Sequence, residues 1–68
     1  MSISRTTEIK ASSKISFDDA MKKGLARAQK TLRKVVSAWI ANQEVFVDTK
    51  GKITEYRVQM KITFILED

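Results

Sequence analysis

The C-terminal stretch of the chain, from Ile53 to about Glu67, alternates regularly between apolar and polar side chains. Successive side chains of a β-strand point to opposite faces, so this alternation predicts a strand with one apolar and one polar face. The apolar face consists of Tyr56, Val58, Met60, Ile62, Phe64 and Leu66, and the polar face of Glu55, Arg57, Gln59, Lys61 and Thr63. A strand of roughly 15 residues is much longer than usual. One helix and one hairpin cannot cover it, so we expect part of it to meet neighbouring subunits.

A second alternating segment precedes this strand, from about Ala38 to Val47. The residues DTKGK join the two segments, and Gly51 in this loop can adopt a positive φ, so we expect a β-hairpin. Counting along the second strand places Trp39, the only tryptophan, on one side together with Ser37, Ala41 and Gln43. The other side holds Ala38, Ile40, Asn42, Glu44 and Phe46, of which we expect Ile40 and Phe46 to pack on a helix.

The N-terminal half predicts a strand and then a helix. Residues from Ile3 to Ala11 alternate in a β-compatible pattern, and Ser16 before Asp18 and Asp19 is typical of a helix N-cap with acids in the first turn. An apolar stripe of about five turns follows at helical spacing, made of Phe17, Met21, Gly24, Leu25, Ala28, Leu32 and Val35. The opposite side carries Lys23, Arg27, Lys30 and Lys34. Glycine is unfavourable inside a helix, so its place in the stripe suggests close approach to the sheet.

The order of elements is therefore β-α-β-β. We expect a two-layer α+β fold, in which a three-stranded antiparallel sheet wraps on one helix in a single domain spanning residues 1–68. A chain of this length buries only about 60% of the surface of its unfolded form. Small chains usually rely on disulfides, metals or oligomerisation. Because the sequence contains no Cys and no His, we expect an oligomer.

The composition argues against catalysis. The commonest general acid/base and the strongest nucleophile are both missing, so we expect no enzyme and no catalytic residues. The neighbouring acids Asp18 and Asp19 diverge on regular structure, as do Glu67 and Asp68, so we expect no metal site. The N-terminus has no apolar segment typical of a signal peptide, and no apolar run approaches about 18 residues. We therefore expect a cytoplasmic protein.

Two features are candidates for binding. The first is Trp39, whose flat side chain, framed by small or amide neighbours, leaves room for a flat ligand or anchors a subunit interface; the two coincide where a ligand lies at an interface. The second is the basic helix side, which fits phosphate groups or a solvated surface, and the net charge of +5 has the same two interpretations. The strand faces lack the interleaved aromatic residues of an RNA-binding sheet. We expect no specific binding of nucleic acid.

Segments from nearly the whole chain resemble the dodecin family. They are Glu8-Ile9 at the end of the first strand, SFDDA from Ser16 to Ala20, LARAQKTLRKV from Leu25 to Val35, and the closing EYRVQMKITFILED. The resemblance implies a hollow homo-dodecamer of cubic symmetry, with helices outside and sheets lining the interior. It also implies flavins bound in pairs between aromatic side chains near two-fold axes, and ligands such as FMN and coenzyme A.

Two positions depart from the flavin-binding members. Alignment without gaps on Thr31 to Arg33 places Ser37 where those proteins have the stacking Trp, and Arg57 where they have the Gln that hydrogen-bonds the isoalloxazine. Trp39 stays on the same face but lies about 7 Å further along the strand. Arg57 is a fixed cation that recognises phosphate or carboxylate. Trp39 and Arg57 together suit a ligand bound in a different pose from that in the flavin-binding members, or a more anionic ligand.

We expect a non-enzymatic storage or buffering shell for a flat small molecule, with riboflavin or FMN as the first candidate. The predicted cofactor-binding residues are Trp39, Arg57, Gln59, Gln43, Ser37 and Lys61. One alternative is the same shell with coenzyme A, a nucleotide or an oxyanion held by Arg57 and Lys61. Calcium ranks below these anions, because only Glu55 and Glu67 are expected on the inner face. The other alternative is a basic module that associates with nucleic acid through Lys23, Arg27, Lys30 and Lys34.

Overall fold

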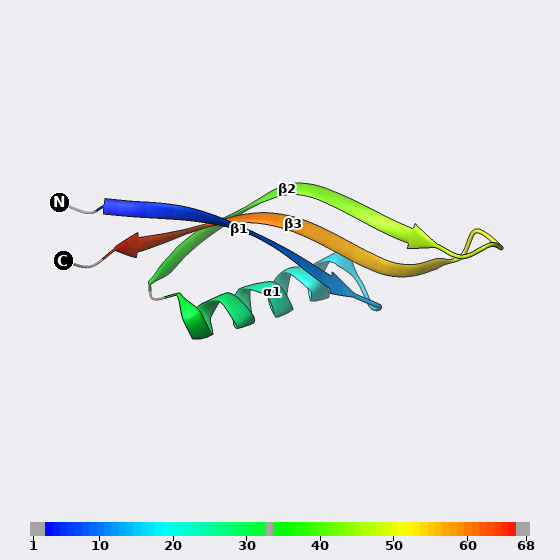
Figure 1. The fold of residues 1–68 in the computed structure, drawn as a ribbon. Helices are drawn as coiled ribbons and strands as arrows, with labels where there is room; N and C mark the ends of the chain where they lie inside the picture. The colour runs from blue at the N-terminus through cyan, green and yellow to red at the C-terminus, as the bar shows by residue number, and fades with distance from the viewer. Residues whose placement is uncertain (1–2, 33, 67–68) are drawn as a thin grey trace.

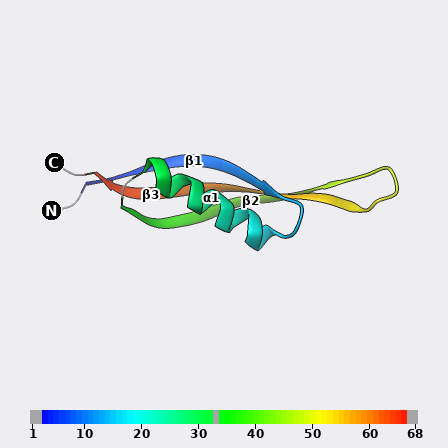
Figure 2. The ribbon, with the colours of Figure 1, turned by 90° about the horizontal axis from the view of Figure 1, so that it is seen from below.

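A computed structural model describes residues 3–32 and 34–66 of the chain. Its four elements are strand β1 (Ile3–Ser13), helix α1 (Phe17–Thr31), strand β2 (Val35–Val47) and strand β3 (Ile53–Leu66). The strands form one antiparallel sheet in the spatial order β1-β3-β2, and α1 lies across one face of it (Figure 1, Figure 2). This confirms the predicted β-α-β-β order and two-layer α+β fold. The predicted end of the last strand at Glu67 lies outside the described residues.

Strand β3 forms the centre of the core. Val58, Met60 and Ile62 have almost no exposed surface, and they pack against Ala20 and Ala28 of α1. The alternation in the sequence therefore identified the correct face of this strand. Because β3 lies between the other two strands, α1 packs on the apolar face of β3 at the centre of the sheet.

The helix begins as predicted and ends earlier. The hydroxyl of Ser16 accepts a hydrogen bond from the backbone N–H of Asp19 at 3.0 Å, as an N-cap residue does. The helix ends at Thr31, so the predicted stripe of about five turns is too long: Val35 belongs to β2, and Lys34, with φ of 53°, lies between the two elements. Lys34 is therefore not part of the basic side of the helix.

Gly24 allows the helix to lie close to the sheet. A side-chain Cβ at this position would overlap the methyl group of Met60 and would lie 2.9 Å from the Cβ of Ala11. Real Cβ atoms do not approach other atoms so closely, and Gly24 itself is buried. The predicted close approach is confirmed, and it explains why a residue unfavourable in helices is found here.

The hairpin between β2 and β3 extends well beyond the helix (Figure 1). Asp48 closes its turn by accepting hydrogen bonds from the backbone N–H groups of Lys50 at 2.8 Å and Lys52 at 3.0 Å. Gly51 adopts φ of 82°, as the sequence predicts for this loop. A helix of 15 residues is only about 22 Å long, whereas the molecule measures 53 Å. The distal part of the hairpin is therefore left without cover, and it exposes apolar side chains, namely Val45, Phe46, Val47 and Ile53.

Candidate ligand-binding face

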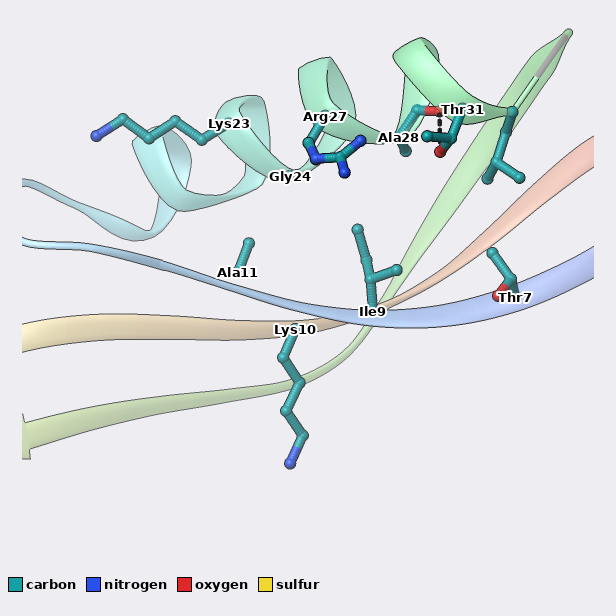
Figure 3. Close-up of a pocket in the computed structure, with 10 residues that line it drawn as sticks. Thr7, Ile9, Lys10, Ala11, Lys23, Gly24, Arg27, Ala28 and Thr31 are labelled. Atoms are coloured by element: carbon teal, nitrogen blue, oxygen red, sulfur yellow. Dashed lines mark hydrogen bonds between the residues drawn. The ribbon is translucent and has the colours of Figure 1, made fainter.

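The sheet face opposite α1, called the open face below, carries a regular array of polar side chains. Residues directly opposite each other on antiparallel strands point to the same face. The register defines a pair of β1 and β3, Ser4–Ile65, nearest the chain termini, followed by five further rows. From the end near the chain termini to the hairpin they are Thr6–Thr63–Ser37, Glu8–Lys61–Trp39, Lys10–Gln59–Asn42, Ser12–Arg57–Glu44 and, between β3 and β2 only, Glu55–Phe46. Figure 3 shows the alternation in β1, where Lys10 points away from α1 while Ile9 and Ala11 point toward it.

Trp39 is the most exposed aromatic residue on this face. Of its surface, 69% is accessible to solvent, although it is a large apolar side chain. The ammonium of Lys61, its partner in register, lies 5.4 Å from the centre of the indole. Ser37 follows in the next row, where it is exposed opposite Thr63. The structure thus brings together three of the residues predicted to bind ligand, namely Trp39, Lys61 and Ser37.

Gln59 lies at the centre of the open face and connects all three strands. Its side-chain carbonyl accepts a hydrogen bond from the amide of Asn42 at 3.1 Å, and its own amide donates to the carboxylate of Glu8. A small depression of about 50 Å³ lies beside it, lined by Lys10, Asn42, Glu44, Arg57 and Gln59. The polar groups of Gln59 therefore already have partners within the chain.

Arg57 is held by three neighbours at once. Its guanidinium lies 4.4 Å from the ring centre of Phe46, donates to the carboxylate of Glu55 at 3.0 Å and donates to the hydroxyl of Ser12 at 3.1 Å. Stacking on an aromatic ring and pairing with a carboxylate are both favourable contacts for a planar guanidinium. Arg57 lies on the predicted face, but its charge is balanced by Glu55.

The facing predicted for the second half of β2 is wrong. The register shifts between Ile40 and Asn42, because an extra residue, Ala41, forms a β-bulge there. Gln43 consequently lies opposite the buried Val58 on the helix side of the sheet, away from Trp39. Phe46, predicted on the helix side, lies instead on the open face, where the guanidinium of Arg57 stacks on its ring.

The same bulge moves Asn42 and Glu44 onto the open face, where the sequence alone did not place them. Glu44, together with Glu8 and Glu55, makes this face richer in carboxylates than expected. Glu67, the other carboxylate expected there, lies outside the described residues. Within residues 3–32 and 34–66, no three His, Cys, Asp or Glu side chains are grouped so that they could hold a metal ion.

A larger cavity of about 520 Å³ lies on the helix side, between α1 and the edge strand β1 (Figure 3). Half of its lining residues are apolar or lack a side chain, namely Ile9, Ala11, Gly24, Ala28 and Leu32. Lys23 and Arg27 from the basic side of the helix border it, and the ammonium of Lys23 forms an ion pair with Asp19 at 3.0 Å. Nothing in the sequence pattern marked this cavity, because the gap beside an edge strand depends on the order of strands in the sheet.

The helix is also too short or too polar to cross a membrane, as judged from the part of the chain that the structure describes.

Comparisons with known proteins agree with the fold. No curated protein sequence matches the chain. Among solved structures, a point variant of the Thermus thermophilus dodecin is similar with a TM-score of 0.92 at 26% identity, each chain being covered completely. The dodecin of Streptomyces davaonensis has a TM-score of 0.92 at 27% identity, with 98% of this chain and 97% of that chain covered. A calcium dodecin from Mycobacterium tuberculosis, described as calcium-chelating, has a TM-score of 0.82 at 25% identity, with 96% and 91% covered.

The family model named Dodecin matches residues 3–67, almost the entire chain. Both the sequence model and the solved structures therefore point to the same group of proteins. The chain belongs to the dodecin family, whose members bind small ligands.

Proposed function

We propose that this dodecin is a non-enzymatic storage or buffering protein that holds a flat small molecule on the open face, with FMN or riboflavin as the first candidate. The observation that carries the proposal is Trp39, a large aromatic side chain that is 69% exposed on a mainly polar face. A flat heteroaromatic ligand that stacks on the indole would remove that apolar surface from water. Ser37 and Gln59 lie in the neighbouring rows on either side of Trp39. The hydroxyl of Ser37 would supply a hydrogen bond, as would the second amide N–H of Gln59, since only one of its two N–H groups is donated to Glu8.

We further propose that the chain assembles as a homo-dodecamer, in which the open face lines the interior. The uncovered distal hairpin supports this, because it exposes Val45, Val47 and Ile53 without a covering element in the single chain. Small domains with exposed apolar surface commonly gain stability through association. In such a shell Trp39 would lie close to its symmetry mates, which would allow a ligand to be held at an interface.

The test uses Trp39 as an intrinsic probe, since it is the only tryptophan. Riboflavin and FMN are titrated while indole fluorescence is followed, and stacking is expected to quench it at micromolar ligand. Absence of quenching by both flavins at tens of micromolar would contradict the proposal.

Two variants of Trp39 test whether stacking on an aromatic ring holds the ligand. The amount of flavin that stays with the protein after desalting is measured for each. Trp39→Ala should lose the flavin. Trp39→Phe, which keeps a flat apolar ring, should retain part of it. Equal retention by the Ala and Phe variants would show that the aromatic face is not what holds the ligand.

A second candidate is the same shell with another anionic ligand, such as coenzyme A, a nucleotide or an oxyanion. The net charge of +5 and the exposed ammonium of Lys61 favour it. Of the two cations expected to hold such a ligand, Arg57 is paired with Glu55, so the proposal assigns this role to Lys61. Calcium is less favoured, because Glu8 and Glu55 of the open face are engaged by Gln59 and Arg57, and the described residues do not group Glu44 with two further acidic side chains that could hold a metal ion.

A further inference from the structure

Two cation–aromatic pairs lie on the open face, and they differ in one respect that bears on ligand choice. Arg57 lies over Phe46 at 4.4 Å, and Lys61 lies over Trp39 at 5.4 Å. The two cations are four positions apart along β3, which corresponds to about 13 Å along the strand. Each pair therefore forms a local environment of its own.

An ion pair compensates the charge of Arg57, whereas within residues 3–32 and 34–66 no ion pair compensates that of Lys61. Glu55 accepts a hydrogen bond from the guanidinium of Arg57 at 3.0 Å, and Ser12 holds the same group from β1. Among the residues that the structure describes, Lys61 forms no ion pair. Glu8 lies opposite it in register, but the carboxylate of Glu8 accepts its hydrogen bond from Gln59. Lys61 is thus a cation whose described contact is the face of the indole.

This arrangement affects neutral and anionic ligands differently. A ring that stacks on the side of the indole where Lys61 lies must either displace the ammonium or lie beside it, so a neutral ring there competes with an existing favourable contact. A ligand that also carries a phosphate gives the ammonium a new partner of opposite charge within a few ångströms. Lysine is suited to this, because it is a compact charge on a flexible stem that can follow the ligand.

We infer that Lys61 makes the Trp39 site selective for flat ligands that carry a phosphate over the same ring without one. The inference rests on the proposed function, since it concerns the same site. It goes beyond that function by naming the charge class of the ligand and the residue that selects it.

Riboflavin and FMN provide the matched probes, because they share the isoalloxazine ring and differ by one phosphate. Dissociation constants are measured by Trp39 fluorescence at physiological salt for the wild-type protein, Lys61→Met, Lys61→Arg and Lys52→Met. Lys52, in the hairpin loop, controls for loss of one positive charge far from Trp39.

The wild type is expected to bind FMN about tenfold more tightly than riboflavin, which corresponds to a free-energy difference of about 1.4 kcal/mol. Lys61→Met should bring the two dissociation constants within about twofold of each other, mainly by weakening FMN. Lys61→Arg should keep most of the preference, and Lys52→Met should keep all of it. Raising the salt concentration should weaken FMN binding and leave riboflavin binding nearly unchanged.

Three results would overturn the inference. The first is equal affinity of the wild type for both flavins. The second is an unchanged preference in Lys61→Met. The third is quenching by inorganic phosphate alone that equals quenching by FMN, because the anion would then bind without the ring. If neither flavin binds the wild type, the proposed function fails together with the inference, whereas the first two results leave the proposed function intact.

Discussion

At the scale of single residues, Ser13 and Asp19 link the end of β1 to the first turn of α1. The hydroxyl of Ser13, which is buried, donates to the carboxylate of Asp19 at 2.5 Å and accepts from the backbone N–H of Ile15 at 2.9 Å. Asp19 also pairs with Lys23 one turn along the helix. The Asp19 carboxylate thus joins the end of β1 to α1 through charge-assisted contacts with Ser13 and Lys23, and the connecting turn is bound by the hydroxyl of Ser13.

The first prediction concerns pH. The hydrogen bond from Ser13, followed by that from Lys23, holds the pKa of Asp19 below its ordinary value of 3.8. A carboxyl group whose pKa is lowered by folding stabilises the folded state above its unfolded pKa of about 3.9, and this contribution is lost as pH falls through the lower folded pKa. Asp19→Asn should therefore reduce the free energy of unfolding at pH 7 and reduce it less near pH 3, as measured by urea denaturation.

Asp18→Asn is the matched control, because Asp18 forms an exposed pair with Lys22 on the same turn and has no contact with Ser13. Its effect should be smaller, as exposed pairs contribute little. An Asp19→Asn variant with the same loss of stability at both pH values would contradict the role given to the charged carboxylate.

The second prediction concerns Arg57. Because Phe46, Glu55 and Ser12 hold its guanidinium, Arg57→Ala should destabilise the protein by about 1 kcal/mol, the combined scale of one cation–π contact and one partly exposed ion pair. FMN affinity should change less than threefold, in contrast to Lys61→Met. Loss of FMN binding in Arg57→Ala with stability unchanged would show that Arg57 contacts the ligand directly.

At the scale of secondary-structure elements, Gly24 determines how closely α1 approaches the sheet. Gly24→Ala would improve helix propensity by about 1 kcal/mol, but overpacking a tight contact typically costs 1–3 kcal/mol. Ala11 is a neighbour without a flexible end that could move away, and Met60 is fully buried. We expect a net loss of about 1 kcal/mol in urea denaturation.

Gly51 offers a comparison in which space is not limiting. Apart from Gly51 and its two chain neighbours, no described residue has an atom within 4 Å of a Cβ built on Gly51, yet its φ of 82° disfavours residues with a side chain. Asn tolerates this conformation better than Ala, so Gly51→Asn should be less destabilising than Gly51→Ala.

A Gly24→Ala variant more stable than the wild type would refute the close packing of α1 on β1 and β3.

The strand β2 shows how far the sequence predicts this fold and its site. The period of β3 was regular, so both faces of that strand, including Arg57, Gln59 and Lys61, could be predicted. In β2 the helix-side apolar residues change from even positions, such as Ile40, to odd ones, such as Val45 opposite Tyr56. Such a change from even to odd positions indicates an inserted residue in the strand. In the sequence alone, however, the even-numbered Phe46 fits a strand without an inserted residue equally well.

Contacts across the sheet resolve that ambiguity, and they depend on register rather than on the local pattern. For this reason Ser37 and Trp39, which precede the bulge, were assigned to the correct face, whereas Gln43 was not. The hydrogen-bond network of Glu8, Gln59 and Asn42 could not be predicted either, because it requires three strands in the order β1-β3-β2.

At the scale of the whole molecule, a thin chain 53 Å long with an uncovered hairpin does not enclose its own apolar surface. We therefore predict a mass by light scattering of about 94 kDa, twelve chains of 7.8 kDa each, at micromolar protein concentration. The hairpin variant Val47→Asp should reduce this mass, since it places a charge in exposed apolar surface that the proposed assembly would bury. A monomeric or dimeric wild type would contradict the shell.

The absorption spectrum of the protein after incubation with FMN and desalting shows whether the open face holds a flat ligand on Trp39. The wild type is predicted to retain a flavin band that elutes with the protein, and Trp39→Ala is predicted to lose it while keeping the same mass. A wild-type protein that elutes without flavin, or a Trp39→Ala variant that retains as much flavin as the wild type, would show that Trp39 does not hold the ligand.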